Sequence, residues 1–173
     1  GNKPKLEDIT KDVVNYIKEV EKDTGKEIPV ISAGGIWDKN DIEKFLSLGA
    51  SGVQMATRFV ATDECDASEE FKKAYVEASK ENIKIIKSPV GMPGRALYNK
   101  FIKKVENEKS KVTKCYGCIK TCDVATTPYC ITKALINAVK GNLDEGLIFV
   151  GSNVHKIEKI VPVHDLMQEL VGV

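Results

Sequence analysis

Four of the five cysteines in this 173-residue sequence lie close together, in the pattern C-x2-C-x3-C-x7-C. They are Cys115, Cys118, Cys122 and Cys130, whereas Cys65 lies far away and is expected to be a packing thiol. Four thiolates in one short loop can surround a tetrahedral metal ion or a four-iron cluster. An odd cysteine count argues against a disulfide framework. We therefore predict metal or redox chemistry here: a 4Fe-4S cluster first and zinc second, with reduced, partly buried thiols as the alternative.

A second group of residues could bind a phosphate. Gly34 and Gly35 follow an apolar run at 28–33, and Ala56 and Thr57 end the next apolar run, about twenty residues later. Glycines after a strand let backbone N–H groups approach a ligand closely, and a following helix N-terminus adds partial positive charge. In eight-stranded α/β barrels the phosphate site follows strands seven and eight. The spacing predicts such a cradle, and a plain tight turn is the alternative.

Other polar residues form weaker patterns. Arg95 could meet a phosphate or carboxylate, or pack on the surface. The Gly-Ser-Asn segment at 151–153 could lie at the mouth of a flavin or substrate site or form a turn, because these residue types are common in turns. Trp37 is expected to pack beside the glycine pair. Asp123 and Asp144 are expected in caps or turns, because neither has a paired acid–base partner in its context.

The elements that must position these residues alternate between helix and strand, which is typical of parallel α/β architecture. Apolar residues at three- and four-residue steps predict helices, and short β-branched runs predict strands buried on both faces. The expected order begins with a helix at 6–20 that stops at Gly25, a strand at 28–33, a helix from the Asp38 cap to Gly49 and a strand at 52–57. A helix at 66–87 follows, with a capping box at Asp66 and Glu69, and then a break at 88–94. The last part contains a charged and partly helical stretch at 100–114, a helix from Pro128 to Gly141 with Cys130 in its first turn, and a last helix at 163–170.

Residues 28–60 resemble the end of the barrel in the nitronate monooxygenase (2-nitropropane dioxygenase) family, which includes flavin-dependent enoyl-acyl-carrier-protein reductases. The resemblance continues through 88–97 and 149–163 and covers almost the whole chain. It implies an α/β fold made of the last two strands and helices of an FMN-binding (β/α)8 TIM barrel, followed by a small, mostly helical segment with the four-cysteine loop. The expected division is 1–90 for the barrel part and 91–173 for the segment after it.

The same resemblance implies the site residues and the chemistry. It assigns the FMN phosphate to Ala33, Gly34, Gly35, Ala56 and Thr57, although the family usually has glycine at the position of Ala56. The function implied is that of an FMN-dependent oxidoreductase acting on a small-molecule substrate, with NAD(P)H as a second candidate partner.

The first six strands and the family's catalytic histidine have no counterpart in the sequence, and neither His155 nor His164 matches that histidine. The chain is therefore expected to be the C-terminal half of the family's protein, a poor catalyst that needs the N-terminal half of the barrel. The cysteine pattern separately resembles the four-iron motif of old-yellow-enzyme relatives such as 2,4-dienoyl-CoA reductase, which are also FMN barrels. The alternative function is a metal-binding accessory module without flavin chemistry.

Composition limits the partners. The 26 basic and 25 acidic residues nearly cancel, which disfavours binding to nucleic acid or to an anionic membrane. No apolar run is long enough to span a bilayer, and we expect a cytoplasmic protein. Two short parallel strands leave open edges, so a homo-oligomer is also expected. A third possibility is a fold of paired protomers that holds no cofactor.

Overall fold

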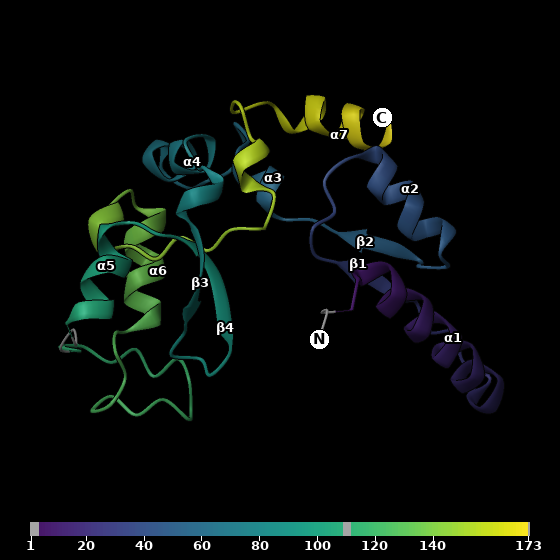
Figure 1. Ribbon diagram of the computed structural model, residues 1–173, viewed down its shortest axis with the longest axis horizontal. Coiled ribbons are helices and arrows are strands. Elements are labelled where there is room, and N and C mark those ends of the chain that lie inside the picture. The colour runs from purple at the N-terminus through teal and green to yellow at the C-terminus, as the bar shows by residue number, and fades with distance from the viewer. Residues whose placement is uncertain (1–3, 109–111, 173) are drawn as a thin grey trace.

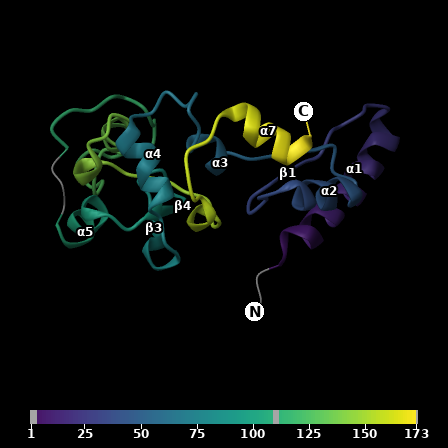
Figure 2. The ribbon, with the colours of Figure 1, turned by 90° about the horizontal axis from the view of Figure 1, so that it is seen from above.

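The computed structural model describes residues 4–108 and 112–172, which form two groups of elements joined by a middle segment (Figure 1). The first group contains α1 Leu6–Thr24, β1 Ile31–Ala33, α2 Lys39–Ser47 and β2 Gly52–Gln54. The second contains α4 Glu69–Val76, β3 Ile83–Lys87, β4 Pro93–Leu97, α5 Lys100–Asn107 and α6 Ile131–Val139, with 3-10 turns η1 Lys80–Asn82 and η2 Leu143–Glu145. Viewed from above, the middle segment between the groups contains α3 Thr57–Val60 and α7 Val163–Val171 (Figure 2); a third 3-10 turn, η3 Val154–Lys156, precedes α7.

The first group confirms the expected order of helix, strand, helix and strand. β1 and β2 pair in parallel, with Ile31 opposite Gly52 and Ala33 opposite Gln54. The expected burial on both faces is wrong, because Ile31 is 54% exposed and, of β1, only Ser32 is buried. Each strand has one neighbour among the described residues, so the sheet lacks the flanking strands that bury a complete parallel sheet.

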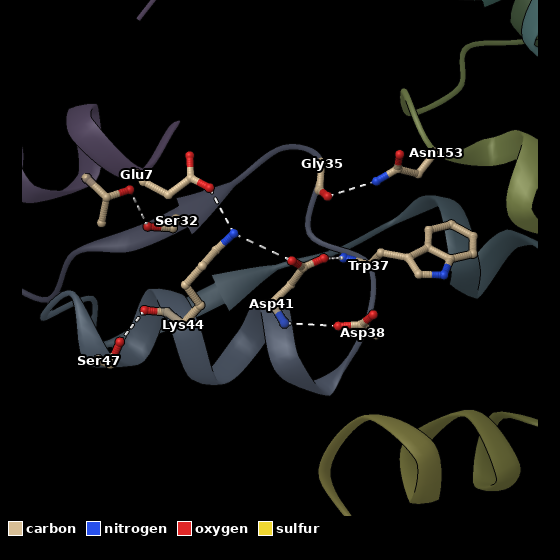
Figure 3. Close-up of polar contacts among 10 residues, drawn as sticks. Glu7, Ser32, Gly35, Trp37, Asp38, Asp41, Lys44, Ser47 and Asn153 are labelled. Carbon is tan, nitrogen blue, oxygen red and sulfur yellow. Dashed lines mark hydrogen bonds and ion pairs between the residues drawn. The ribbon is translucent and has the colours of Figure 1, made fainter. Parts of the chain in front are cut away.

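Polar contacts fix α1 and α2 against this small sheet. The buried hydroxyls of Thr10 and Ser32 are hydrogen-bonded at 3.0 Å, and Lys44 on α2 donates to Glu7 on α1 at 2.8 Å (Figure 3). α1 ends at Gly25, whose φ of 66° gives the left-handed cap that the sequence predicts. These contacts join α1 to β1 and to α2, while the pairing of β1 with β2 places the two strand ends beside each other.

The predicted helix over 66–87 is wrong in its second half. α4 ends at Val76, and Ile83–Lys87 is the strand β3, which pairs antiparallel with β4. The helix begins after Ser68, whose Oγ accepts from the backbone N–H of Phe71 at 3.3 Å, and not at a capping box on Asp66. Three isoleucines in five residues suit a strand once a partner strand is available.

The segment after the barrel part is less helical than expected, because it contributes the strand β4 to a β3–β4 hairpin. β4 takes up Pro93 and Gly94, and the apolar run at 147–150 lies along β4: Leu97 N–H donates to Ile148 C=O at 3.0 Å, and Val150 N–H donates to Arg95 C=O at 2.9 Å. The expected boundary at residue 90 falls within the hairpin turn, and the division into 1–90 and 91–173 stays a prediction.

Buried side chains form three clusters. Two lie in the second group of elements, around α4 and around the hairpin with α5 and α6. The third joins α2 to α7 and includes Phe45 from α2 and Leu166 and Leu170 from α7. The expected last helix is confirmed, and it packs on α2 of the first group. No helix in 4–108 or 112–172 is both long enough and apolar enough to cross a membrane.

Candidate functional site

A cavity of about 230 Å³ lies at the carboxyl ends of β1 and β2. Three segments line it: 33–37 after β1, 54–58 after β2, and 151–153 from much later in the chain. The five residues predicted to form a phosphate cradle lie on its wall: Ala33, Gly34, Gly35, Ala56 and Thr57. The structure therefore brings these residues together, and their role as phosphate ligands stays a prediction.

The glycine pair shapes one wall of the cavity. Gly34 and Gly35 have φ angles of 109° and 73°, which side-chain-bearing residues rarely adopt. A Cβ added to Gly34 would meet no heavy atom within 4 Å, and one added to Gly35 would have the Ser152 Oγ as its nearest neighbour at 3.8 Å. The wall is therefore bare backbone, open to a ligand that approaches closely.

Backbone donors are available at this wall. Within the described part of the chain, the N–H groups of Gly35, Ala56 and Thr57 have no protein acceptor. The N-terminus of α2 contributes less than the sequence predicts, because Asp38 and Asp41 already occupy it (Figure 3). Asp38 Oδ1 accepts from Asp41 N–H at 3.0 Å, and Asp41 Oδ2 accepts from Trp37 N–H at 2.9 Å.

The segment at 151–153 is attached to both strand ends. Gly151 N–H donates to Thr57 Oγ1 at 2.9 Å, and Asn153 Nδ2 donates to Gly35 C=O at 2.9 Å (Figure 3). A Cβ on Gly151 would lie 2.5 Å from Thr57 Oγ1, so only glycine fits there. Because Thr57 Oγ1 is an acceptor in this contact, its own hydrogen stays free to donate to a ligand.

Arg58, next to the cradle, is already paired. Its two terminal nitrogens donate to the Glu169 carboxylate on α7 at 2.6 and 2.7 Å, and its guanidinium lies 4.9 Å from the centre of the Trp37 ring. The hydrogen bonds from Arg58 hold the pKa of Glu169 below its ordinary value. Glu169 was missed by the sequence analysis, and no local pattern points to it, because it lies 111 residues from Arg58.

The four clustered cysteines lie apart from this site, in the loop before α6. Cys115, Cys118, Cys122 and Cys130 line one small cavity of about 30 Å³, and all are free thiols. Cys130 is the N-cap residue of α6 and not part of its first turn, which corrects the expectation that Pro128 opens the helix. No three potential ligands in 4–108 and 112–172 are grouped so as to hold an ion. The four cysteines therefore form no ready-made ion site, and the predicted cluster and zinc sites stay predictions.

The remaining candidates have structural partners. Asp123 forms a turn, accepting from Ala125 N–H and from the Thr126 hydroxyl, both at 2.9 Å. Asp144 in η2 pairs with Lys100 at 2.9 Å. Neither histidine lines the cavity at the strand ends.

The family follows from comparison with known proteins. A sequence model described as nitronate monooxygenase matches residues 1–172. The chain belongs to the nitronate monooxygenase family. Within this family, it is 38% identical over 85 residues to a probable nitronate monooxygenase of Staphylococcus saprophyticus, a match covering 49% of this chain and 24% of that protein. It is 27% identical over 149 residues to a probable nitronate monooxygenase of Bacillus subtilis, covering 83% of this chain and 39% of that protein.

Solved structures have the same fold. FabK from Thermotoga maritima matches 98% of this chain and 49% of its own, with a TM-score of 0.70 and 26% identity. Nitroalkane oxidase from Streptomyces ansochromogenes matches 97% of this chain and 45% of its own, with a TM-score of 0.61 and 20% identity, which is a likeness of fold alone. These proteins are TIM barrels, in agreement with a partial α/β barrel. The chain spans less than half the length of the family relatives and solved structures that it matches.

Proposed function

We propose that this chain supplies the C-terminal part of an FMN-dependent oxidoreductase and that the cavity at the strand ends holds the FMN phosphate. The observation that carries the proposal is the cavity itself. Bare backbone at Gly34 and Gly35 lines the same cavity as Ala56 and Thr57, whose N–H groups have no acceptor in the described part of the chain, and the chain belongs to the nitronate monooxygenase family. Convergent backbone donors are a common way to bind a phosphate.

The residues present fit a phosphate without a neighbouring cation. Arg58 is neutralised by Glu169, so binding would depend on the N–H groups of Gly35 and Ala56 and on the N–H and hydroxyl of Thr57. When bound, FMN would supply the redox chemistry, and these residues would fix its position. The cavity of about 230 Å³ is smaller than the roughly 300–1,000 Å³ pockets that enclose whole ligands, so it suits the phosphate end of the nucleotide.

The rest of the catalytic site would come from the remainder of the barrel. The exposed side chains of Ile9, Val13 and Tyr16 on α1 and Ile31 on β1 support this, because a complete barrel would cover such apolar groups. Neither His155 nor His164 lines the cavity, so we expect this chain alone to bind flavin without turning over substrate. The family supports a nitronate or an enoyl thioester as the substrate class, and NAD(P)H stays a predicted electron donor.

The test compares FMN with riboflavin, which lacks the phosphate, in titrations followed by flavin fluorescence. The wild-type chain should prefer FMN. Gly34→Ala should reduce that preference about ten- to a hundredfold, because a side chain at a φ of 109° strains the turn that presents Gly35 N–H. That loss corresponds to about one hydrogen bond to a charged group. Gly91→Ala is the matched control, because Gly91 also has a positive φ and open space around its Cβ position but lies in the hairpin turn. Equal binding of both flavins by the wild type would contradict the proposal.

A further inference from the structure

The segment between α5 and α6 is long, because α5 ends at Asn107 and α6 begins at Ile131. Its described part, 112–130, contains neither helix nor strand. Loops longer than about 12–15 residues without secondary structure are uncommon in compact domains and are often functional. Local turns hold this one together, such as the hydrogen bond from Cys122 N–H to Ile119 C=O at 3.2 Å. Chain length and weak backbone support together suggest that something else stabilises the loop.

The thiols of this loop meet at one place. All four of its cysteines line the same cavity of about 30 Å³, and most of the other lining residues are apolar, including Ile119, Val124 and Ile131. In this arrangement the cavity has the size of one ion or a water-sized group. Thiolates are soft ligands that select zinc among the common divalent metals.

The turn between the first two cysteines provides an independent observation. Gly117 has a φ of 62°, and its N–H donates to Cys115 Sγ at 3.4 Å. No atom crowds Gly117, so the glycine serves the left-handed turn that directs its N–H at the sulfur. An N–H donated to sulfur stabilises the thiolate form, which is the form that binds metal.

The surrounding charges also suit a thiolate site. Cys130 is the N-cap of the nine-residue helix α6, where the helix dipole favours negative charge. Four thiolates around a divalent ion leave an excess negative charge, and residues 112–130 carry two lysines, Lys114 and Lys120, against one acid, Asp123.

We propose that Cys115, Cys118, Cys122 and Cys130 bind one Zn²⁺ tetrahedrally and that this ion fixes the loop. The site is structural and independent of the flavin site. Because no three potential ligands in the described residues are grouped around an ion position, the sulfurs must close on the ion when it binds. Binding therefore orders the loop and releases the thiol protons.

The first experiment measures zinc in the 173-residue chain purified under reducing conditions with zinc in the medium. The wild type should contain about one zinc per chain, and Cys118→Ser should contain almost none. Cys65→Ser is the matched control and should keep its zinc, because Cys65 does not line the cavity. Thiol titration of the native wild type should find one reactive cysteine, Cys65, and a chelator should expose the other four.

The second experiment does not depend on the variants folding. Adding Co²⁺ to the chelator-treated, reduced wild type should give the thiolate-to-metal charge-transfer and tetrahedral absorption bands of a four-sulfur site, and Zn²⁺ should displace the cobalt. Three results would overturn the proposal. The first is iron and sulfide bound in place of zinc, and the second is cysteines that react with a thiol reagent only after a reductant is added, which indicates disulfides. The third is five reactive thiols with no cobalt bands.

Discussion

Thr57 combines a structural and a ligand-facing role in one hydroxyl. It accepts from Gly151 N–H and lies on the cavity wall, where its hydrogen can point to a phosphate. The neighbouring Ala56 has a φ of −131°, which lies outside the left-handed region that favours glycine. An alanine side chain is therefore compatible with this φ, and the N–H of Ala56 remains available.

At the residue scale, we predict that Thr57→Val destabilises the chain although it keeps the side-chain shape. Valine removes the acceptor of Gly151 N–H, and an unpaired, partly buried N–H costs about 1–3 kcal/mol. Urea unfolding followed by circular dichroism measures the loss. Thr57→Ser keeps the hydroxyl and serves as the control, and equal stability of the two variants would show that the hydrogen bond contributes little.

Helix α7 is connected to the strand ends through Arg58. Glu169 of α7 accepts hydrogen bonds from the Arg58 guanidinium, which is therefore not free to bind a ligand in the cavity. The stacking of Arg58 on Trp37 and its bond to the Trp37 carbonyl at 3.2 Å keep the segment after the glycine pair in place. α7 thus affects the site without touching it.

At the element scale, we predict that Glu169→Gln lowers stability in a pH-dependent way. Arg58 lowers the pKa of Glu169 in the folded chain, so the unfolded chain binds more protons between that lowered pKa and the ordinary value of 4.5. The contribution of the pair is fully present above this window and is lost as the pH falls through it. Because the Glu169 side chain is 54% exposed, the ion pair should contribute less than about 1 kcal/mol to the free energy of unfolding at neutral pH.

Urea unfolding of the wild type and Glu169→Gln at several pH values measures this difference. Glu19→Gln provides the control, because Glu19 pairs with Lys22 where both side chains are more than two-thirds exposed, and its removal should change little. A difference between wild type and Glu169→Gln that persists well below pH 4.5 would mean that packing, not charge, explains it.

At the scale of the whole molecule, α7 near the end of the described chain packs on α2 of the first group. Leu166 and Leu170 of α7 complete the cluster around α2, while Trp37 packs beside a cluster of the second group. The ribbon shows α7 near the end of α2 (Figure 1). Trp37 is the only tryptophan, and it lies between Arg58 and Lys156 at the junction of the two groups. Its fluorescence therefore reports on that junction.

At the scale of the molecule, we predict that Leu166→Ala destabilises the first group of elements by about 2–5 kcal/mol, the usual cost of such a cavity in a core. Leu166 is 1% exposed, whereas Leu46 on α2 is 44% exposed, so Leu46→Ala should cost far less. Urea unfolding followed by Trp37 emission should show a lower midpoint for Leu166→Ala only. Similar midpoints for both variants would argue against the role of α7 in closing the fold.

The sequence by itself determined the local features of this protein. Helical periodicity, the Asp38 cap and the stop at Gly25 predicted the elements of the first group, and the glycine pair after β1 predicted five residues that meet on one cavity. These features depend on neighbours a few positions apart, which a pattern can show. Periodicity also located the final helix α7.

Only the tertiary structure decided the rest, because it depends on partners far apart in the chain. Ile83–Lys87 became a strand because β4 lies beside it, and the exposure of β1 and β2 depends on which strands flank them. The bonds from Gly151 to Thr57 and from Arg58 to Glu169 join segments 94 and 111 residues apart. No local propensity encodes such pairings, since each exists only when folding brings the two segments together.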